Sequence, residues 1–193
     1  VSASVPFGIS LAHIHGGELT QGAMDDALRH SLTKLSHLHF VSTPEYARRV
    51  AQLGEEAWRI IVSGAPSLDN LHIMKFPTCD ELEEHFRFKL HPAPLLVTFH
   101  PVTLELDRTE SQIAELMAAL NELGMPVIFT MPNADTHNSI VRQYIARYVD
   151  THSSAWCVEN FGTQNYFGVM QFAAAMVGNS SSGIIEAPSF GLP

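Results

Sequence analysis

Short apolar segments alternate with amphipathic segments along almost the whole chain. The apolar segments are strand-sized and predict β-strands at residues 6–15, 38–43, 59–64, 93–100, 125–132, 154–160 and 176–179. In the first amphipathic segment, a methionine and three leucines fall on one helical face, at positions 24, 28, 32 and 35. Helices are predicted at residues 22–37, 44–54, 77–90, 107–124, 134–150 and 165–175, with a last one after the serines near the C-terminus.

This alternation predicts an α/β fold, because apolar strands between helices are typical of parallel sheets covered on both faces. Strand–helix units lie on both sides of an acidic, proline-flanked region at residues 76–94, which indicates two Rossmann-like lobes with a boundary near residue 90. Residues 1–90 are expected to form the later part of one lobe, truncated at its N-terminal side, and residues 91–193 most of a second. The chain opens without a methionine and stops just after a helix-ending glycine, so we expect a piece of a longer protein.

Polar and small residues follow four of the predicted strands. In open parallel sheets, ligands bind beyond the carboxyl ends of the strands. The four segments are therefore expected to line one shared cleft. They are residues 13–18, 100–103, 131–135 and 178–183.

The last of these segments, Gly178-Asn179-Ser180-Ser181-Ser182-Gly183, has the composition of a phosphate site. Small residues let a phosphate approach the backbone, and hydroxyls and amides at a helix N-terminus donate hydrogen bonds to it. Glu186 lies one helical turn further on, where its carboxylate can accept hydrogen bonds from the two hydroxyls of a ribose. An ordinary serine-rich helix cap, with Glu186 as a capping or solvated charge, explains the same pattern.

Three residues after the central strands are candidate ligand contacts with equally plain alternatives. His100 stands between an apolar strand and a proline, where it can reach a phosphate oxygen or simply close a strand-end hydrogen bond. Asn133 and Asp135 follow the next strand and can contact a nucleotide, or make a turn and cap the following helix.

The segment that begins at His13 carries a different set of ionisable groups. His13 and His15 are expected to share one face of a strand with Glu18 nearby, an arrangement found in metal sites. Orientation of a substrate is the more common role of a strand-end histidine, so no metal is predicted here. Asp25 and Asp26 open the next helix, where they are suited to its dipole.

Composition and charge narrow the classes of function. The formal net charge of −9 excludes a general nucleic-acid binder but not a nucleotide ligand. No apolar run is long enough to span a membrane, and no signal peptide is visible. The two cysteines have no metal or redox spacing, so they are interpreted as free thiols of a cytoplasmic protein.

Four segments in order, residues 13–40, 99–103, 131–136 and 177–193, closely resemble the UDP-N-acetylglucosamine 2-epimerase family, most of all its hydrolysing branch in sialic- and legionaminic-acid synthesis. The resemblance implies two Rossmann-like lobes of the GT-B type, the second lacking its last elements here. It implies a UDP-sugar substrate, no cofactor and a dimeric or tetrameric full-length protein. It also implies elimination of UDP with loss of the C2 proton, followed by addition of water.

The resemblance also implies roles for particular residues. His100 matches the histidine at the diphosphate and also belongs to the expected catalytic group, together with Asp25, His15 and Glu18. The expected UDP contacts are His100, Asn133, Asp135, Asn179, Ser180, Ser181, Ser182, Gly183 and Glu186.

One departure from the family pattern concerns catalysis. Several relatives read "HIEGGE" where this chain reads "HIHGGE", so His15 stands in the place of a catalytic glutamate. Either His15 or Glu18 then transfers the proton, or the sugar differs, as in the branch that handles bacillosamine-type sugars. The alternatives are a non-hydrolysing epimerase, a GT-B glycosyltransferase and a non-catalytic UDP-sugar sensor.

Overall fold

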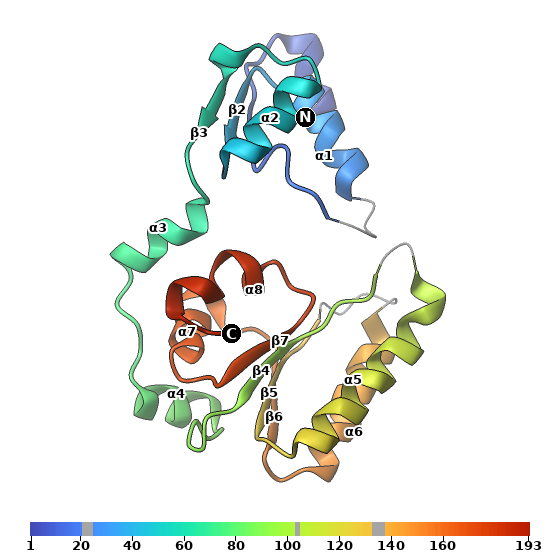
Figure 1. Ribbon diagram of the computed structural model, residues 1–193, viewed down its shortest axis with the longest axis vertical. Helices are drawn as coiled ribbons and strands as arrows, with labels where there is room; N and C mark the ends of the chain where they lie inside the picture. Colours follow the sequence, from blue (N-terminus) through green and yellow to red (C-terminus); the bar gives the residue numbers. More distant parts are fainter. Residues whose placement is uncertain (21–24, 103–104, 133–137) are drawn as a thin grey trace. The chain divides into compact units, whose positions relative to one another are not determined.

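The computed structural model describes residues 1–20, 25–102, 105–132 and 138–193. The chain divides into two compact units, Val1–His72 and Ile73–Pro193, each with its own parallel sheet (Figure 1). None of the described helices has the length and apolar character needed to cross a membrane.

The first unit contains a three-stranded parallel sheet in the order β1-β2-β3. Its strands are β1 (Ala12–Ile14), β2 (Leu38–Val41) and β3 (Ile60–Val62). Its helices are α1 (Asp25–Leu35), α2 (Pro44–Gln52) and α3 (Pro66–Ile73), which ends at the unit boundary, with 3-10 turns at Ser2–Phe7 and Ala57–Arg59. Thr43 caps α2 by accepting a hydrogen bond from the amide of Tyr46, as expected for a threonine before a helix-starting proline.

The second unit contains a four-stranded parallel sheet in the order β6-β5-β4-β7. Its strands are β4 (Leu95–Thr98), β5 (Val127–Thr130), β6 (Ala155–Val158) and β7 (Ala175–Gly178). Its helices are α4 (Cys79–Phe86), α5 (Thr109–Leu123), α6 (Ser139–Thr151), α7 (Gly162–Met170) and α8 (Ser182–Ile185), with 3-10 turns at Leu106–Arg108 and Ala187–Phe190.

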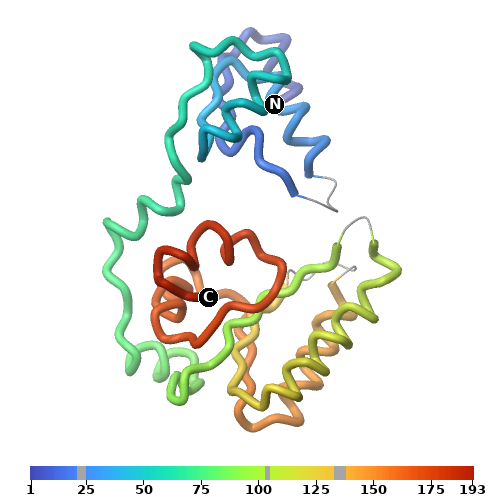
Figure 2. Tube along the Cα trace, in the orientation of Figure 1, coloured from blue at the N-terminus to red at the C-terminus, as the bar shows by residue number. Residues whose placement is uncertain are grey.

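Helices cover both faces of this second sheet, with α5 and α6 on one side and α7 and α8 on the other (Figure 1). Consecutive residues of β4, from Leu95 to Thr98, are therefore all buried, as predicted for a continuous apolar strand. The core under α5 and α6 joins apolar side chains of the strands to Ile113, Met117 and Ile145 of these helices. In Figure 2, the C-terminal segment runs beside β4, which agrees with the pairing of β7 with β4.

Several elements differ from the sequence-based prediction. The first strand covers only Ala12–Ile14, because Ser2–Phe7 forms a 3-10 turn that ends at a left-handed Gly8. Helix α3 was not predicted. The last helix is a single turn, Ser182–Ile185, because Pro188 has no amide hydrogen to donate to the carbonyl of Ile184.

The apolar stripe of α1 is also less buried than its pattern suggests. Leu28 is 59% exposed, whereas the buried residue of α1 is Thr33. Met24 lies outside the described residues.

The division between the units falls earlier in the chain than the expected boundary near residue 90. Residues 73–90 belong to the second unit because α4 packs against α7. The methylene groups of Pro77 and the side chain of Leu82 lie so close to Gly168 of α7 that a β-carbon there would stand 3.0 Å from Pro77 Cδ. Phe88 and Leu90 are buried, and the ring of Phe88 stacks on that of Phe86.

Two buried histidines lie inside the first unit. The Nδ1 of His13 is 3.1 Å from the hydroxyl of Thr33, which itself donates to the carbonyl oxygen of Arg29 at 3.1 Å. The Nε2 of His39 is 3.2 Å from Glu55 Oε2, and Lys34 Nζ contacts the other oxygen of the same carboxylate at 2.5 Å. Desolvation lowers the pKa of His13, and the nearby charges of His39, Arg29 and His15 lower it further, while Glu18 acts in the opposite direction.

We expect Gly178→Ala to destabilise the second unit by more than about 3 kcal/mol. Gly178 has a φ of 143°, and a β-carbon there would lie 1.8 Å from the carbonyl oxygen of Thr98. Gly124 is the matched control, since its φ of 60° is also left-handed but an added β-carbon meets nothing within 4 Å. Gly124→Ala should therefore cost only about 1–2 kcal/mol. Equal costs in urea unfolding would contradict the close approach of β7 to β4.

The stability of the first unit should fall as the pH drops below about 6.5. The folded pKa of His13 is lowered relative to the unfolded chain, so the unfolded state binds more protons in that range. Stability is then complete above pH 6.5 and is lost as the pH falls towards the folded pKa. Urea unfolding at pH 8 and pH 5.5 can be followed by the fluorescence of Trp58 in a Trp156→Phe background. His13→Gln should flatten this pH dependence, and an unchanged slope would contradict the assignment.

Candidate functional site

The carboxyl ends of β4, β5 and β7 lie side by side in the second sheet, with Thr98 in register with both Thr130 and Gly178. Because the strands are parallel, the segments that follow them emerge at the same edge. The predicted strand-end segments at residues 100, 131 and 178 therefore lie at one sheet edge. The fourth segment, after β1, belongs to the other sheet, so the four strand ends predicted to line one cleft are divided between two units.

Asn179 joins two of these strand ends. Its Oδ1 accepts a hydrogen bond from the amide of His100 at 2.8 Å, and its Nδ2 donates to the carbonyl oxygen of His100 at 2.7 Å. The amide of Asn179 donates to the carbonyl of Thr98 at 3.2 Å. Asn179 is thus the residue that holds His100 beside the serine segment, a role that sequence analysis did not assign to it. The His100 residue is exposed, yet partial desolvation of its imidazole lowers the pKa below the ordinary value.

The three serines have different environments. Ser180 Oγ lies 2.8 Å from Ser182 Oγ and accepts a hydrogen bond from the Ser182 amide at 3.3 Å. Ser181 is exposed, at the first position before α8. Gly183 follows within the single helical turn. Such a short helix has little dipole, so hydroxyls and amides, more than the helix, are the donors that this segment offers to an anion.

A line of hydroxyl groups continues from Ser182 into the unit. The hydroxyl of Tyr166, on α7, is 3.1 Å from Ser182 Oγ and 3.4 Å from Thr98 Oγ1. Thr130 Oγ1 donates to Thr98 Oγ1 at 2.7 Å. Sequence analysis missed Thr98, Thr130 and Tyr166. The available signal was a threonine as the last residue of two adjacent apolar strands, but no pattern in the sequence placed α7 beside them.

The structure describes only one of the three remaining predicted contacts of this unit, Glu186. Glu186 is half-buried one turn beyond Ser182, and its amide donates to the Ser182 carbonyl oxygen at 3.0 Å. The predicted spacing between the two residues is therefore present. Asn133 and Asp135 lie outside the described residues.

In the first unit, His15, Glu18 and Ser42 form a cluster at the carboxyl ends of β1 and β2. His15 Nδ1 is 2.7 Å from Glu18 Oε1, and Ser42 Oγ donates to the same oxygen at 2.6 Å. The carboxylate fixes the ring so that a neutral His15 carries its hydrogen on Nδ1 and its lone pair on Nε2. Ser42 was not predicted, although it follows an apolar strand.

The turn that carries this cluster requires unusual backbone angles. His15 has a φ of 65°, in the left-handed region that few residues other than glycine adopt. Gly17 has a φ of 78°, and a β-carbon there would lie 2.4 Å from the Tyr46 carbonyl oxygen. His15 is thereby turned out of the strand.

This turn removes the premise of the metal hypothesis. His13 is buried and bound to Thr33, whereas His15 is bound to Glu18, so the two histidines do not share a face. Among the described residues, no group of three or more His, Cys, Asp or Glu side chains is arranged to hold a metal ion.

Asp25 and Asp26 differ although they are neighbours. Asp25 is the first residue of α1 and is exposed; no hydrogen bond among the described residues joins it to His15 or Glu18. Asp26 accepts from the amide of Thr20 at 3.0 Å and pairs with Arg29 at 3.3 Å. Arg29 also donates to the carbonyl oxygen of Glu18 at 2.8 Å, so this pair supports the loop after His15.

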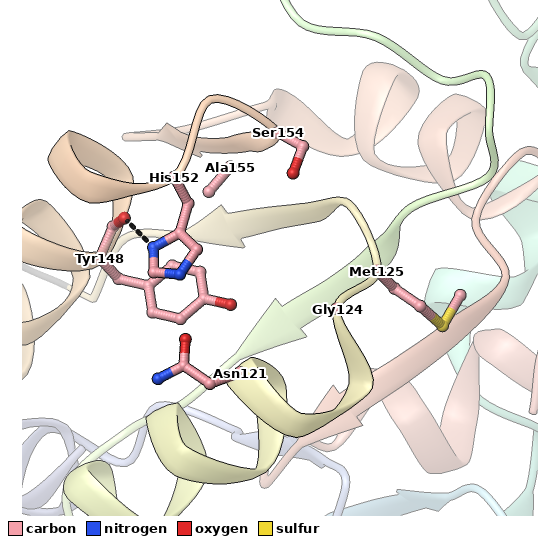
Figure 3. A pocket seen from close by; sticks show the side chains of 7 residues that line it. All are labelled: Asn121, Gly124, Met125, Tyr148, His152, Ser154 and Ala155. Carbon is pink, nitrogen blue, oxygen red and sulfur yellow. Dashed lines mark hydrogen bonds between the residues drawn. The ribbon is translucent and has the colours of Figure 1, made fainter.

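Two hollows of the second unit lie away from these strand ends. The first has a volume of about 50 Å³, is lined by Tyr148 and His152 with stacked rings, and sits at the amino ends of β5 and β6 (Figure 3). It is too small for a nucleotide. The second is a wider, open hollow at α4 and α7 whose lining includes Lys75, Glu81 and His85. Neither includes a residue of the serine segment.

Comparison with known proteins identifies the family. The family model described as UDP-N-acetylglucosamine 2-epimerase matches residues 1–193. The GDP/UDP-N,N'-diacetylbacillosamine 2-epimerase (hydrolyzing) of Campylobacter jejuni is 41% identical over 96% of this chain and 49% of its own length. The UDP-N,N'-diacetylbacillosamine 2-epimerase (hydrolyzing) of Legionella pneumophila is 34% identical over 98% of this chain and 50% of its own length. The chain thus spans about half the length of these curated relatives.

Solved structures confirm the predicted fold class. The MnaA–UDP co-structure from S. aureus matches 100% of this chain and 51% of that chain, with a TM-score of 0.78 and 16% identity. The UDP-GlcNAc 2-epimerase of Neisseria meningitidis bound to UDP-GlcNAc matches 100% of this chain and 54% of that chain, with a TM-score of 0.76 and 20% identity. The fold is therefore of the α/β class, with two Rossmann-like units of the GT-B type, and each unit contains a parallel sheet. Because the family model matches all 193 residues of the chain, the chain belongs to the UDP-N-acetylglucosamine 2-epimerase family.

Proposed function

We propose that this chain is part of a hydrolysing UDP-sugar 2-epimerase. Its substrate is UDP-N-acetylglucosamine or the 2,4-diacetamido analogue, and its products are UDP and the free N-acetylmannosamine-type sugar. The observation that carries the proposal is 41% identity, over 96% of the chain, to a relative named as a hydrolysing 2-epimerase. The match of the family model to residues 1–193 supports it.

The reaction requires two kinds of group. A base takes the proton from C2 while the bond from C1 to the UDP oxygen breaks, and the electron pair of the C–H bond forms the C1–C2 double bond. Water then adds a hydroxyl to C1 and a proton returns to C2. Hydrogen-bond donors must meanwhile stabilise the charge that grows on the leaving diphosphate.

We assign the UDP end to the carboxyl edge of the second sheet. Ser180 and Ser181 offer hydroxyls to the diphosphate, and the neighbouring His100 is held there by Asn179. Ser182 and Gly183 complete the turn, and Glu186 binds the ribose hydroxyls. Asn133 and Asp135 are nucleotide contacts by family resemblance. The lowered pKa of His100 favours a neutral ring near pH 7, which donates one hydrogen bond without adding a charge.

We assign the proton transfer to the cluster of the first unit. The Nε2 of His15 is the proton-transferring atom, since Glu18 holds Nδ1 at 2.7 Å. Glu18 therefore acts through His15, and Ser42 fixes the carboxylate. Asp25 is the further catalytic carboxylate that the family resemblance indicates.

The setting of the protein follows from the same proposal. Cys79 and Cys157 are both free, which fits the reducing cytoplasm, where sugars for sialic- and legionaminic-acid synthesis would be made. We propose a homodimer or homotetramer of the full-length protein, in keeping with the family resemblance.

Incubation of the full-length protein with UDP-N-acetylglucosamine or its 2,4-diacetamido analogue in deuterated water should yield UDP and a free sugar. The released sugar should carry deuterium at C2, because the proton taken there exchanges with solvent before one returns. NMR reads both outcomes in one sample. An epimerised sugar still attached to UDP would identify a non-hydrolysing enzyme, and binding of UDP without turnover would identify a sensor.

Glu18→Gln should lower kcat by about 10²-fold or more with little change in KM, because the neutral amide no longer supports a protonated His15. Asp25→Asn should also lower kcat. Glu45→Gln is the matched control, since Glu45 pairs only with Arg48 and Arg49 on the surface of α2 among the described residues. Unchanged kcat in Glu18→Gln would remove the His15–Glu18 pair from the mechanism.

A further inference from the structure

Five hydroxyl groups form a continuous line at the carboxyl edge of the second sheet. Thr130 Oγ1 donates to Thr98 Oγ1 at 2.7 Å, and Thr98 Oγ1 is 3.4 Å from the Tyr166 hydroxyl. The Tyr166 hydroxyl is 3.1 Å from Ser182 Oγ, which is 2.8 Å from Ser180 Oγ. The line thus runs from the carboxyl ends of β5 and β4 to the serine segment.

The hydrogen bond from Thr130 to Thr98 sets one direction for this line. A hydroxyl has one hydrogen to donate and two lone pairs that accept. Thr130 Oγ1 donates to Thr98 Oγ1 at 2.7 Å, and the Val97 carbonyl oxygen at 3.4 Å is its longer alternative, so the hydrogen of Thr98 is free to point towards Tyr166. Either atom can be the donor in the contacts of Ser182 with Tyr166 and with Ser180. In the direction that begins at Thr130, Tyr166 donates to Ser182 and Ser182 donates to Ser180. Met176 Sδ, at 3.9 Å from Tyr166 and 4.0 Å from Ser182, is a weak acceptor and competes little.

The outer end of the line is Ser180. Its oxygen already accepts from the Ser182 amide at 3.3 Å, and the Ser182 hydroxyl takes the second lone pair. Both acceptor positions of Ser180 are then occupied, and its own hydrogen is left to point outwards. A hydroxyl in this state donates only, which suits an anion and excludes a ligand group that must donate to it.

We propose that Tyr166 is a positioning residue for the diphosphate, because its hydroxyl orients Ser182 and thereby makes Ser180 a donor. The proposal rests on the proposed function, since it assumes that a nucleoside diphosphate binds at Ser180. A hydrogen-bonded line of this kind also polarises cooperatively, so its outer donor strengthens as negative charge grows on the leaving group.

Removal of the Tyr166 phenol oxygen alone distinguishes the positioning role from a packing role of the ring. The Tyr166 ring also contacts the ring of Phe161, with the centroids 6.0 Å apart, and Tyr166→Phe keeps that contact. The substitution removes only the oxygen that links Thr98 to Ser182. Tyr144→Phe is the matched control, because the Tyr144 hydroxyl on α6 donates to Glu110 at 3.2 Å and has no part in the line.

The test measures UDP binding to the full-length protein by calorimetry. Tyr166→Phe should weaken Kd by about 5- to 30-fold, and Tyr144→Phe should leave it unchanged. Ser180→Ala should weaken binding at least as much. The double variant Ser180→Ala/Tyr166→Phe should bind no worse than Ser180→Ala alone, because Tyr166 acts only through the serine. Additive losses would indicate a merely structural role for Tyr166 and would overturn the proposal.

The remaining outcomes are also decisive. If Ser180→Ala weakens binding and Tyr166→Phe binds as the wild type does, the inference fails while the proposed function stands. If the wild type does not bind UDP, both fail. If Tyr166→Phe unfolds, Thr98→Val decides, since it removes the preceding hydroxyl without changing the side-chain shape. It should weaken binding by a smaller factor than Ser180→Ala, and unchanged affinity would overturn the proposal.

Discussion

The close approach of β7 to β4 is the constraint on which the site of the second unit depends. Gly178 stands so near the Thr98 carbonyl that no side chain fits, and Asn179 then bonds both the amide and the carbonyl of His100. These contacts place the serine segment beside the end of the central strand. Without them, Thr98 and Ser182 would not lie on either side of the Tyr166 hydroxyl.

Each unit has its own polar cluster at the carboxyl edge of its sheet, and the two clusters suit different tasks. The second unit offers neutral hydroxyls, amides and an imidazole, which stabilise an anion without a metal. The first unit offers a carboxylate that orients a histidine, an arrangement suited to general acid–base catalysis. This difference in chemistry is the reason why we propose the leaving group for one unit and the proton transfer for the other.

Local pattern predicted most of the elements and the candidate residues at the strand ends. Apolar strands such as Leu95–Thr98 and the proline-started helix α2 depend on interactions between residues close in sequence, so the sequence predicted them. The same holds for the position of the serine segment after a strand, whereas the hydrogen bond between His15 and Glu18 appeared only in the structure. Residues 73–90 joined the second unit through a contact with a distant part of the chain, since the ring of Phe88 lies against that of Phe161. The shortness of the last helix has a local cause, because Pro188 lacks the amide hydrogen that would continue it.

The sequence alone determined the α/β class, the candidate residues at the strand ends and the family resemblance, since these are properties of residue order and spacing. Tertiary structure alone decided which hydroxyls touch. Tyr166, Thr98 and Ser182 meet only because α7 covers the sheet beside β4 and β7. It also turned His15 away from His13, through a backbone angle that the surrounding contacts impose. Hydrogen bonds act over about 3 Å, and only a folded chain brings groups so far apart in sequence to that distance.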